Sequence, residues 1–288
     1  MVERGNSNLK NCNSCFLIAS DALKALRKLP DKYFSAVITS PPYWGIRDYG
    51  VKGQIGLEDN VHQYVLNLAK VFREVKRVLK DNGTIWLNIG DSYASGNRKY
   101  RANDKKYGAR SMSIRPKNPK GIKNKDLIGV PWRLAFKLQQ ESWYLRSDII
   151  WYKPNAMPES VKDRPHRNHE YLFLFSKKEC YYFNNEGLKN CDGSKMRSVW
   201  KIARNSYNGN HFATFPESLV LPCIKSSTKK YDYVLDPFCG VGTVGKICNK
   251  LNRGFVGIDL NKEYINEAQK VIVTSTEILM NELKTFLS

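Results

Sequence analysis

A glycine-rich turn near the carboxyl end of the chain has the residue types of a nucleotide-binding loop. The segment 234–245 leads from an apolar run into a helical pattern, and Gly240, Gly242 and Gly245 satisfy the pattern G-x-G-x-x-G. The next apolar run ends at Asp259, whose carboxylate is placed to accept two hydrogen bonds from a ribose. Both features suit any cofactor that contains adenosine. A turn that only packs a helix on a strand is the alternative.

The carboxylate of Asp236 separates the candidate cofactors. A pyrophosphate is an anion that binds at the bare amino end of a helix, where an aspartate would repel it. S-adenosylmethionine carries a sulfonium and an α-ammonium group, so an acid beside a tight glycine turn favours this cofactor over a nicotinamide dinucleotide. Because only 29 of the 288 residues follow Asp259, we expect the cofactor strand to be late in the sequence but central in the sheet.

The segment Thr39–Trp44, with the sequence Thr-Ser-Pro-Pro-Tyr-Trp, is a second candidate for chemistry. Consecutive prolines cannot donate to a sheet ladder, so the strand before them must end there, at the edge where α/β proteins bind ligands. Ser40 and the Pro41 carbonyl then form a stiff array of acceptors beside Tyr43. Acceptors on both N–H groups of a nucleobase amine would free its lone pair for in-line attack on a methyl sulfonium, while Tyr43 stacks on the extruded base. A simple double-proline turn is the alternative.

Apolar runs alternate with helical patterns along most of the chain, which is typical of an α/β domain with a mostly parallel sheet and helices on both faces. We expect strands at 16–19, 35–39, 84–89, 144–152, 171–175, 233–235 and 255–258. We expect helices at 22–29, 61–80 and 131–140, and two more that begin near residues 242 and 262. The segment Asp81–Gly83 should stop the helix at 61–80.

The net charge of +20 indicates a polyanionic partner, nucleic acid first. In the stretch 92–126, eleven Lys and Arg residues stand against two Asp, and the stretch 193–216 holds four Lys and Arg residues and no acid. Two basic inserts in one α/β body favour a polyanion groove over a solvated surface. The residues expected to contact the nucleic acid are Arg98, Lys99, Arg101, Lys105, Lys106, Arg110, Lys195, Arg197, Trp200, Lys201 and Arg204.

Composition excludes several classes of protein. Hydrophobic residues make up 42% of the chain and aromatic residues 12%, which is too much for a disordered basic tail. No apolar run approaches the roughly 18 residues of a membrane span, and the amino terminus lacks a secretory signal. Seven dispersed cysteines fit free thiols, and we expect no metal site. We therefore expect a cytoplasmic protein associated with the nucleoid.

These motifs resemble those of the amino-group DNA methyltransferases, and specifically the cytosine-N4 branch, in which Ser-Pro-Pro-Tyr replaces the Asp-Pro-Pro-Tyr or Asn-Pro-Pro-Tyr of many adenine-N6 enzymes. The resemblance covers most of the chain, and the catalytic motif precedes the cofactor motif, as in the circularly permuted β group. It implies a Rossmann-like fold that binds S-adenosyl-L-methionine. The catalytic residues would be Ser40, Pro41, Pro42 and Tyr43. The cofactor-binding residues would be Asp21, Thr39, Asp236, Phe238, Gly240, Gly242, Thr243 and Asp259.

The resemblance also assigns roles to single positions. Asp21 matches the acid that contacts the cofactor adenine, the segment 236–243 matches the loop that binds the methionine part, and Asp259 matches the ribose-binding acid. The segments 88–93 and 163–170 look like further family segments to which we assign no role.

We expect a single catalytic domain over residues 1–288, with a DNA-contacting basic insert at 92–126 and a basic segment at 180–210 as the candidate target-recognition region. The expected reaction is methyl transfer to the N4 amine of cytosine in double-stranded DNA by base flipping. In a restriction-modification system, a cognate endonuclease would be a further partner. An adenine-N6 target and an inert nucleic-acid-binding protein of the same fold are the alternatives. Cytosine-C5 methylation is disfavoured because it needs a nucleophilic cysteine, and none lies near the two prolines.

Overall fold

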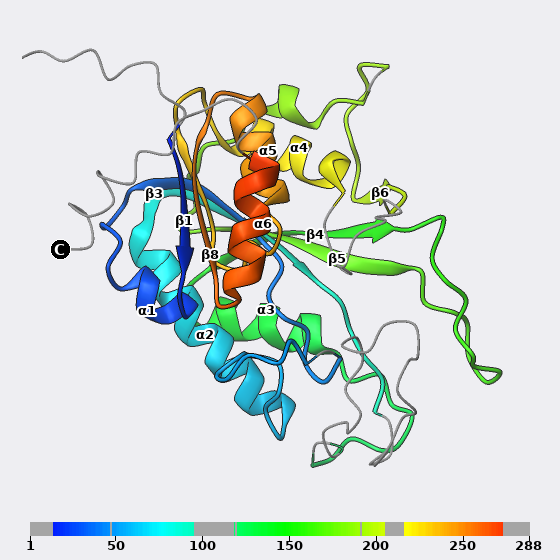
Figure 1. Cartoon of the computed structure of the whole chain (residues 1–288). Helices are drawn as coiled ribbons and strands as arrows, with labels where there is room; N and C mark the ends of the chain where they lie inside the picture. Colours follow the sequence, from blue (N-terminus) through cyan, green and yellow to red (C-terminus); the bar gives the residue numbers. More distant parts are fainter. Residues whose placement is uncertain are drawn as a thin grey trace, which may run out of the picture.

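An eight-stranded sheet forms the centre of the computed structural model (Figure 1). The structure describes residues 14–46, 48–94, 118, 120–190, 192–204 and 216–272. The strand order is β1, β8, β7, β2, β3, β5, β4, β6, and neighbours are parallel except where β5 pairs with β3 and β4. The strands are β1 (Cys15–Ala19), β2 (Phe34–Thr39), β3 (Leu79–Ile89), β4 (Tyr144–Tyr152), β5 (His169–Ser176), β6 (Val199–Lys201), β7 (Tyr233–Asp236) and β8 (Gly254–Asp259).

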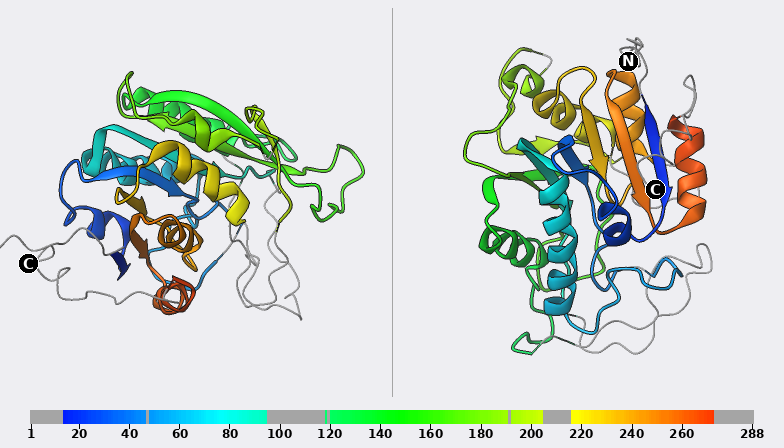
Figure 2. Two further views of the ribbon diagram at one scale, coloured as in Figure 1. Left: turned by 90° about the horizontal axis from the view of Figure 1, so that it is seen from above. Right: turned by 90° about the vertical axis from the view of Figure 1, so that its left-hand side faces the viewer.

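Helices cover both faces of the sheet (Figure 2). Successive residues of a strand point to opposite faces, so Val37 of β2 packs in one core with α1, α2 and α3, whereas Ile38 packs in the other with α4, α5 and α6. The helices are α1 (Ala22–Leu26), α2 (Val61–Val78), α3 (Val130–Gln140), α4 (Glu217–Ser227), α5 (Thr243–Lys250) and α6 (Lys262–Ile272), with a short 3₁₀ helix η1 (Asn185–Leu188). The architecture is the expected Rossmann-like α/β fold.

The cofactor strand occupies the interior of the sheet, as its position in the sequence predicted. β7 lies between β8 and β2, and Ala36 of β2 pairs with Val234 of β7. Because β2 and β7 are parallel neighbours, the segments that follow them emerge side by side. A strand near the carboxyl end of the chain therefore stands next to one near the amino end.

The end of α2 differs from the prediction. The helix ends at Val78, because Leu79 has an extended backbone (φ −75°, ψ 138°) and begins β3. The pairing of β3 with β2 then skips from Leu79 to Thr84, so residues 80–83 bulge from the ladder. A Cβ on Gly83 would lie 2.6 Å from Leu79 Cγ, so this bulge requires glycine. The segment Asp81–Gly83, which was predicted to stop the helix, therefore lies in a strand bulge.

The region between β5 and β7 contains structure that the sequence patterns did not predict. It contains η1, the three-residue strand β6 and the helix α4, all too short or too irregular to show a clear period. The Tyr182 amide donates to the Asn82 carbonyl and the Asn184 amide to the Ser226 carbonyl. The first part of the expected recognition region 180–210 therefore packs at the start of β3 and on α4. Within the described residues, no helix is both long enough and apolar enough to span a membrane.

Candidate active site

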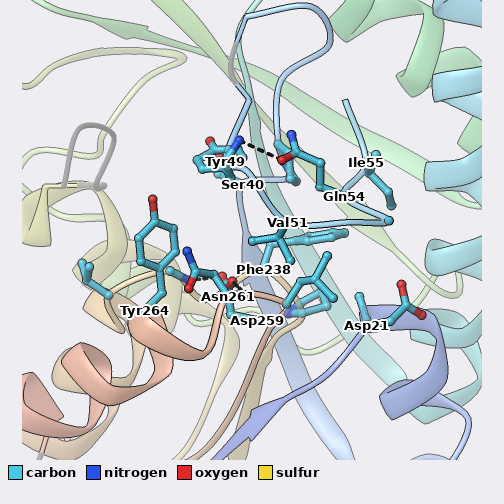
Figure 3. A pocket seen from close by; sticks show the side chains of 17 residues that line it. Asp21, Ser40, Tyr49, Val51, Gln54, Ile55, Phe238, Asp259, Asn261 and Tyr264 are labelled. Atoms are coloured by element: carbon cyan, nitrogen blue, oxygen red, sulfur yellow. Dashed lines mark hydrogen bonds between the residues drawn. The ribbon is translucent and has the colours of Figure 1, made fainter. Parts of the chain in front are cut away.

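A pocket opens at the carboxyl ends of four parallel strands (Figure 3). β1, β8, β7 and β2 are neighbours in the sheet, so the segments that follow them meet at one edge. The structure thereby brings the glycine loop and the Ser-Pro-Pro-Tyr motif together. The lining residues are Asp21, Ala22, Ser40, Pro42, Tyr49, Val51, Gly53, Gln54, Ile55, Pro237, Phe238, Gly240, Val241, Asp259, Leu260, Asn261 and Tyr264.

The glycine loop has backbone geometry that requires glycine. Gly240 (φ +50°) and Gly242 (φ +80°) both lie in the left-handed region. A Cβ on Gly242 would lie 2.9 Å from Cβ of Ala268, so this glycine also allows the start of α5 to approach α6. Thr243 is the first residue of α5, and neither it nor Gly242 is among the lining residues. Gly240 lines the pocket directly.

The Asp259 carboxylate fixes the glycine loop against the end of β8. Its Oδ2 accepts a hydrogen bond from the Gly240 amide (2.9 Å) and its Oδ1 from the Asn261 amide (2.8 Å). A carboxylate oxygen has two acceptor positions, so each oxygen keeps one for a ligand hydroxyl. Burial raises the pKa of Asp259 above its ordinary value. Asp259 therefore organises the loop, and it lines the pocket where it could also accept from a ligand hydroxyl.

Asp236 lies under the loop rather than on the pocket surface. Its side chain is buried, and its Oδ1 accepts hydrogen bonds from Thr39 Oγ1 (2.6 Å) and from the Phe238 amide (3.1 Å). Burial raises the pKa of Asp236 to about 7, against the opposing effect of these two bonds. A cation bound nearby would stabilise the ionised form. Thr39 supports this carboxylate and does not line the pocket.

The pocket residues fit S-adenosyl-L-methionine. Val51, Ile55 and Leu260 provide apolar walls for an adenine ring, and the free acceptor positions of Asp259 suit a ribose. Asp21 follows β1, the neighbour of β8, and also lines the pocket; its Oδ1 accepts from the Lys24 amide (2.9 Å), so its carboxylate caps α1. The buried carboxylate of Asp236 would favour a cationic group beside the loop.

Neighbouring segments hold the Ser-Pro-Pro-Tyr motif in place. Ser40 and Pro42 line the pocket, whereas Pro41 is buried. The Tyr64 hydroxyl on α2 donates to the Pro42 carbonyl (2.8 Å). A Cβ on Gly90 would lie 2.7 Å from Cε2 of Tyr43, so the absence of a side chain there makes room for the tyrosine ring.

A polar cluster next to the motif was not predicted. The Tyr43 hydroxyl lies 2.7 Å from Glu170 Oε2 and 3.1 Å from Asn88 Oδ1, and Ser40 Oγ donates to the Tyr43 oxygen (3.3 Å). Lys153 pairs with Glu170. Asn88 and Glu170 belong to the two sequence segments that carried no assigned role. The sequence signal for this cluster was the position of the two residues. One lies near the end of β3 and the other near the start of its antiparallel neighbour β5.

A strap, residues 44–46 and 48–58, covers part of the pocket and was also missed. The Gly45 amide donates to the Gly56 carbonyl (2.9 Å) and closes its base. The Tyr49 ring lies edge-on to the Tyr264 ring of α6, with 6.2 Å between centroids, and the Tyr49 amide donates to Gln54 Oε1 (2.7 Å) (Figure 3). The closely spaced glycines that follow the Ser-Pro-Pro-Tyr motif were the sequence signal that could have predicted this strap.

The basic insert leaves and re-enters the body at one place. Tyr93 and Leu127 form an antiparallel bridge, and the Ala94 amide donates to the Asp126 carbonyl (2.9 Å). The Arg164 guanidinium lies 3.6 Å from the Tyr93 ring centroid, which places the loop between β4 and β5 beside the insert. The insert residues expected to contact nucleic acid, which are Arg98, Lys99, Arg101, Lys105, Lys106 and Arg110, lie outside the described residues.

The expectation that Trp200 contacts DNA is wrong. Its side chain is only 4% exposed, its indole N–H donates to the Arg197 carbonyl (2.7 Å), and its ring packs near Trp86 with 6.0 Å between centroids. The alternation of β6 explains this placement, because Val199 and Lys201 point outward while Trp200 points into the core.

The four basic residues around Trp200 are exposed but do not lie together. Lys195 and Arg197 precede β6, and Lys195 forms a β-bridge with Lys189 near η1. Lys201 ends β6 at the edge that carries the pocket, since β6 runs parallel to β4 and β4 antiparallel to β5. Arg204 follows, and its amide donates to Asn155 Oδ1 (2.9 Å) in the loop between β4 and β5.

The chain belongs to the N6/N4 DNA methylases, since the model of this DNA methylase family matches residues 34–270. S-adenosyl-L-methionine is the methyl donor of this family, which agrees with the cofactor expected from the glycine loop and Asp236. The circularly permuted motif order is accordingly that of an amino-group DNA methyltransferase.

Individual relatives agree with this assignment. The Type II methyltransferase M.Cfr9I of Citrobacter freundii is 55% identical over 260 residues, which cover 89% of this chain and 87% of the relative. The Type II methyltransferase M.SmaI of Serratia marcescens is 52% identical over 269 residues, which cover 91% of this chain and 92% of the relative.

Two solved structures share the fold. The PvuII DNA methyltransferase, described as cytosine-N4-specific, superposes with a TM-score of 0.70 at 20% identity, over 96% of this chain and 92% of that chain. The protein TTHA0409 of Thermus thermophilus, a putative DNA modification methylase solved with S-adenosyl-L-methionine, superposes with a TM-score of 0.62 at 20% identity, over 92% and 99%.

Proposed function

We propose that this protein transfers a methyl group from S-adenosyl-L-methionine to the N4 amine of cytosine in double-stranded DNA. The position of Ser40 carries the proposal, because this side chain lines the cofactor pocket where β2 ends beside β7. The Ser-Pro-Pro-Tyr motif and the fold shared with the cytosine-N4-specific PvuII enzyme support cytosine over adenine.

In the proposed mechanism, the residues of the motif hold and polarise the target amine. When bound, S-adenosyl-L-methionine supplies an electrophilic methyl group. The target base must leave the duplex, because its amine is otherwise inside the base stack. Ser40 Oγ and the Pro41 carbonyl accept its N–H groups, which directs the nitrogen lone pair into the pocket, and the Tyr43 ring stacks on the base. Because the motif and the pocket share one edge, direct transfer needs no covalent enzyme intermediate.

The proposed DNA-binding surface lies at the same edge of the sheet. It combines Lys201 and Arg204 with the described ends of the insert, residues 92–94 and 120–126, and the loop between β4 and β5 contacts both parts through Asn155 and Arg164. The basic residues of the insert that lie outside the described residues remain a prediction. Lys195 and Arg197 precede β6, at the end of this strand away from the pocket. They contribute at the periphery of the DNA-binding surface. Their cationic side chains would neutralise phosphates and release counterions.

Analysis of the methylated nucleoside tests the proposed function. The purified protein is incubated with duplex DNA and methyl-labelled S-adenosyl-L-methionine, and the digested DNA is separated by liquid chromatography and mass spectrometry. We expect the label in N4-methylcytosine. Label in N6-methyladenine would support the alternative specificity, and DNA without label would support an inert binding protein.

The relatives suggest a biological setting. Several are Type II methyltransferases, so we propose that this protein acts in a restriction-modification system with a cognate endonuclease. Such an enzyme would work on the nucleoid in the cytoplasm. Methylation-sensitive sequencing of DNA modified by this protein would identify the recognition site.

A further inference from the structure

The Ser40 and Tyr43 hydroxyls belong to a hydrogen-bonded chain that ends on a buried ion pair. Ser40 Oγ lies 3.3 Å from the Tyr43 hydroxyl, which lies 2.7 Å from Glu170 Oε2. The other carboxylate oxygen of Glu170 pairs with Lys153 Nζ. The Glu170 and Lys153 side chains are 19% and 11% exposed, so both charges are largely removed from water.

The carboxylate fixes the direction of this chain. An ionised carboxylate only accepts hydrogen bonds, so Tyr43 must donate its single hydroxyl proton towards Glu170. Asn88 has the same polarity, because its Nδ2 donates to the Tyr171 carbonyl (3.1 Å) and its Oδ1 faces the Tyr43 hydroxyl (3.1 Å). The Tyr43 hydroxyl proton therefore points towards Glu170 and Asn88. The Tyr43 oxygen accepts the hydrogen bond from Ser40.

This direction determines what Ser40 can offer to a base. Its one hydroxyl proton is used on Tyr43, so its remaining capacity is to accept. An exocyclic amine donates hydrogen bonds, whereas a base carbonyl or an unprotonated ring nitrogen accepts them. We infer that Glu170, held ionised by Lys153, is a positioning residue that acts through Tyr43 to make Ser40 an obligate acceptor for the target amine. The inference rests on methyl transfer to an amino group and applies to cytosine and adenine alike.

The surroundings stabilise the ionised form of Glu170 and the protonated form of Tyr43. Burial by itself would raise the pKa of Glu170, but the charge of Lys153 and its hydrogen bond outweigh burial and hold that pKa below its usual value. Lys153 Nζ also lies 4.2 Å from the Trp151 ring centroid, a favourable cation–π distance. Burial, and then the charge of Glu170, raise the pKa of Tyr43 well above its usual value. The phenol therefore keeps the proton that it donates.

The variant Glu170→Gln tests the direction of the chain. Glutamine has the same size, carries no charge, and offers an amide that can donate to Tyr43, so Ser40 is free to turn its proton towards the base. We expect the single-turnover rate constant of methyl transfer to fall by about 10- to 100-fold. The dissociation constants of S-adenosyl-L-methionine, from calorimetry, and of DNA, from fluorescence anisotropy, should stay within about two-fold of wild type.

Asp232→Asn is the matched control for the loss of charge. Asp232 forms a partly buried pair with Lys80 (3.1 Å) at the opposite end of the sheet from the pocket. Its isosteric replacement also leaves a lysine without its carboxylate partner. We expect the single-turnover rate constant of this variant to stay within about two-fold of wild type.

Tyr43→Phe interrupts the hydrogen-bonded chain and leaves the ion pair of Glu170 intact. This variant tests the inference even if Glu170→Gln does not fold. The ring stays beside Gly90, and only the hydroxyl is lost. We expect a comparable loss of rate with unchanged dissociation constants. Since both variants interrupt one chain, the double variant should be slower than the slower single variant by no more than about two-fold.

Three results would overturn the inference. The first is a rate constant within about two-fold of wild type for Tyr43→Phe or for folded Glu170→Gln, and the second is a double variant in which the two losses multiply. The third is a loss of cofactor or DNA affinity that parallels the loss of rate, because it would assign Glu170 a purely structural role. The nucleoside formed by the wild-type protein tests the proposed cytosine specificity separately.

Discussion

The two halves of the active site are built in different ways. The cofactor half, at the ends of β7 and β8, is organised mainly by contacts within one βαβ unit, such as Asp236 with the Phe238 amide and Asp259 with the Asn261 amide. One hydrogen bond from a distant segment, donated by Thr39 to Asp236, supports it. The catalytic half is organised by side chains from distant segments, since Tyr43 contacts Asn88 and Glu170. A local motif can encode most of the first half, whereas the second exists only once β3 and β5 have paired.

The difference also concerns charge. In the cofactor half, the Asp236 carboxylate is buried without a cationic partner among the groups that bond to it, and burial raises its pKa to about 7. In the catalytic half, the Glu170 carboxylate is largely removed from water but is paired with Lys153 and has a lowered pKa. The cofactor half thus gains from a cationic ligand, while the catalytic half carries its own counter-charge. This contrast predicts that the two halves fail differently when altered.

The largest effect is expected for Tyr43→Ala, which removes both the ring and the hydroxyl of the catalytic half. We expect the single-turnover rate constant to fall by about 100-fold or more, because the target base loses its stacking partner and Ser40 its orientation. Cofactor affinity, measured by calorimetry, should hardly change. Tyr144→Ala, at an exposed tyrosine that begins β4, is the matched control and should alter neither quantity. Equal losses of rate and cofactor affinity would contradict the separation of the halves.

Asp259→Ala should have the opposite signature. It removes the carboxylate expected to bind the ribose and the anchor of the Gly240 amide, so the dissociation constant of S-adenosyl-L-methionine should rise by about 10- to 100-fold. At saturating cofactor the rate constant should recover most of its wild-type value. Asp148→Ala, at an exposed aspartate on β4, is the control. An unchanged dissociation constant for Asp259→Ala would remove this residue from the cofactor site.

A smaller, pH-dependent effect is expected from Asp236. Its pKa of about 7 lies above the ordinary carboxyl range, so the cofactor-free protein binds this proton more tightly than the unfolded chain does. The contribution of Asp236 to stability is therefore present at low pH and is lost as pH rises through about 7. A cationic ligand favours the ionised form, so cofactor binding should release a proton and tighten several-fold between about pH 6 and about pH 7.5.

Calorimetry in two buffers of different ionisation enthalpy measures this proton release. Asp236→Asn keeps the size of the side chain and cannot ionise, so it should abolish most of the release. An Asp236→Asn protein that releases as many protons as wild type would show that another group titrates.

The smallest effects are expected on the DNA surface. Lys201→Gln and Arg204→Gln should each reduce the slope of log affinity against log salt by about one, because each removes a phosphate contact. Lys195→Gln and Arg197→Gln, on the far side of β6, should change it less. Fluorescence anisotropy at several salt concentrations provides the comparison. If the second pair has the larger effect, the DNA path lies over η1 rather than over the pocket edge.

Sequence patterns predicted the fold well and the site unevenly. The alternation of strands and helices and the central place of β7 follow from apolar periodicity and from the late position of the glycine loop. The bulge at residues 80–83 was missed because it depends on the pairing of β3 with β2. Trp200 was misplaced because a three-residue edge strand has too few residues to show its alternation. Glu170 acquires its role through contact with Tyr43, and Lys153 through its pair with Glu170, and no local spacing encodes either contact.

The double variant Tyr43→Ala with Asp259→Ala tests most directly whether the two halves act separately. Its single-turnover rate constant at saturating cofactor and its cofactor dissociation constant should be measured together with those of the single variants. We expect the double variant to have the rate constant of Tyr43→Ala and the dissociation constant of Asp259→Ala, each within about two-fold. A dissociation constant or a rate constant that departs from these values by about tenfold would show that the halves are coupled, and would contradict the account.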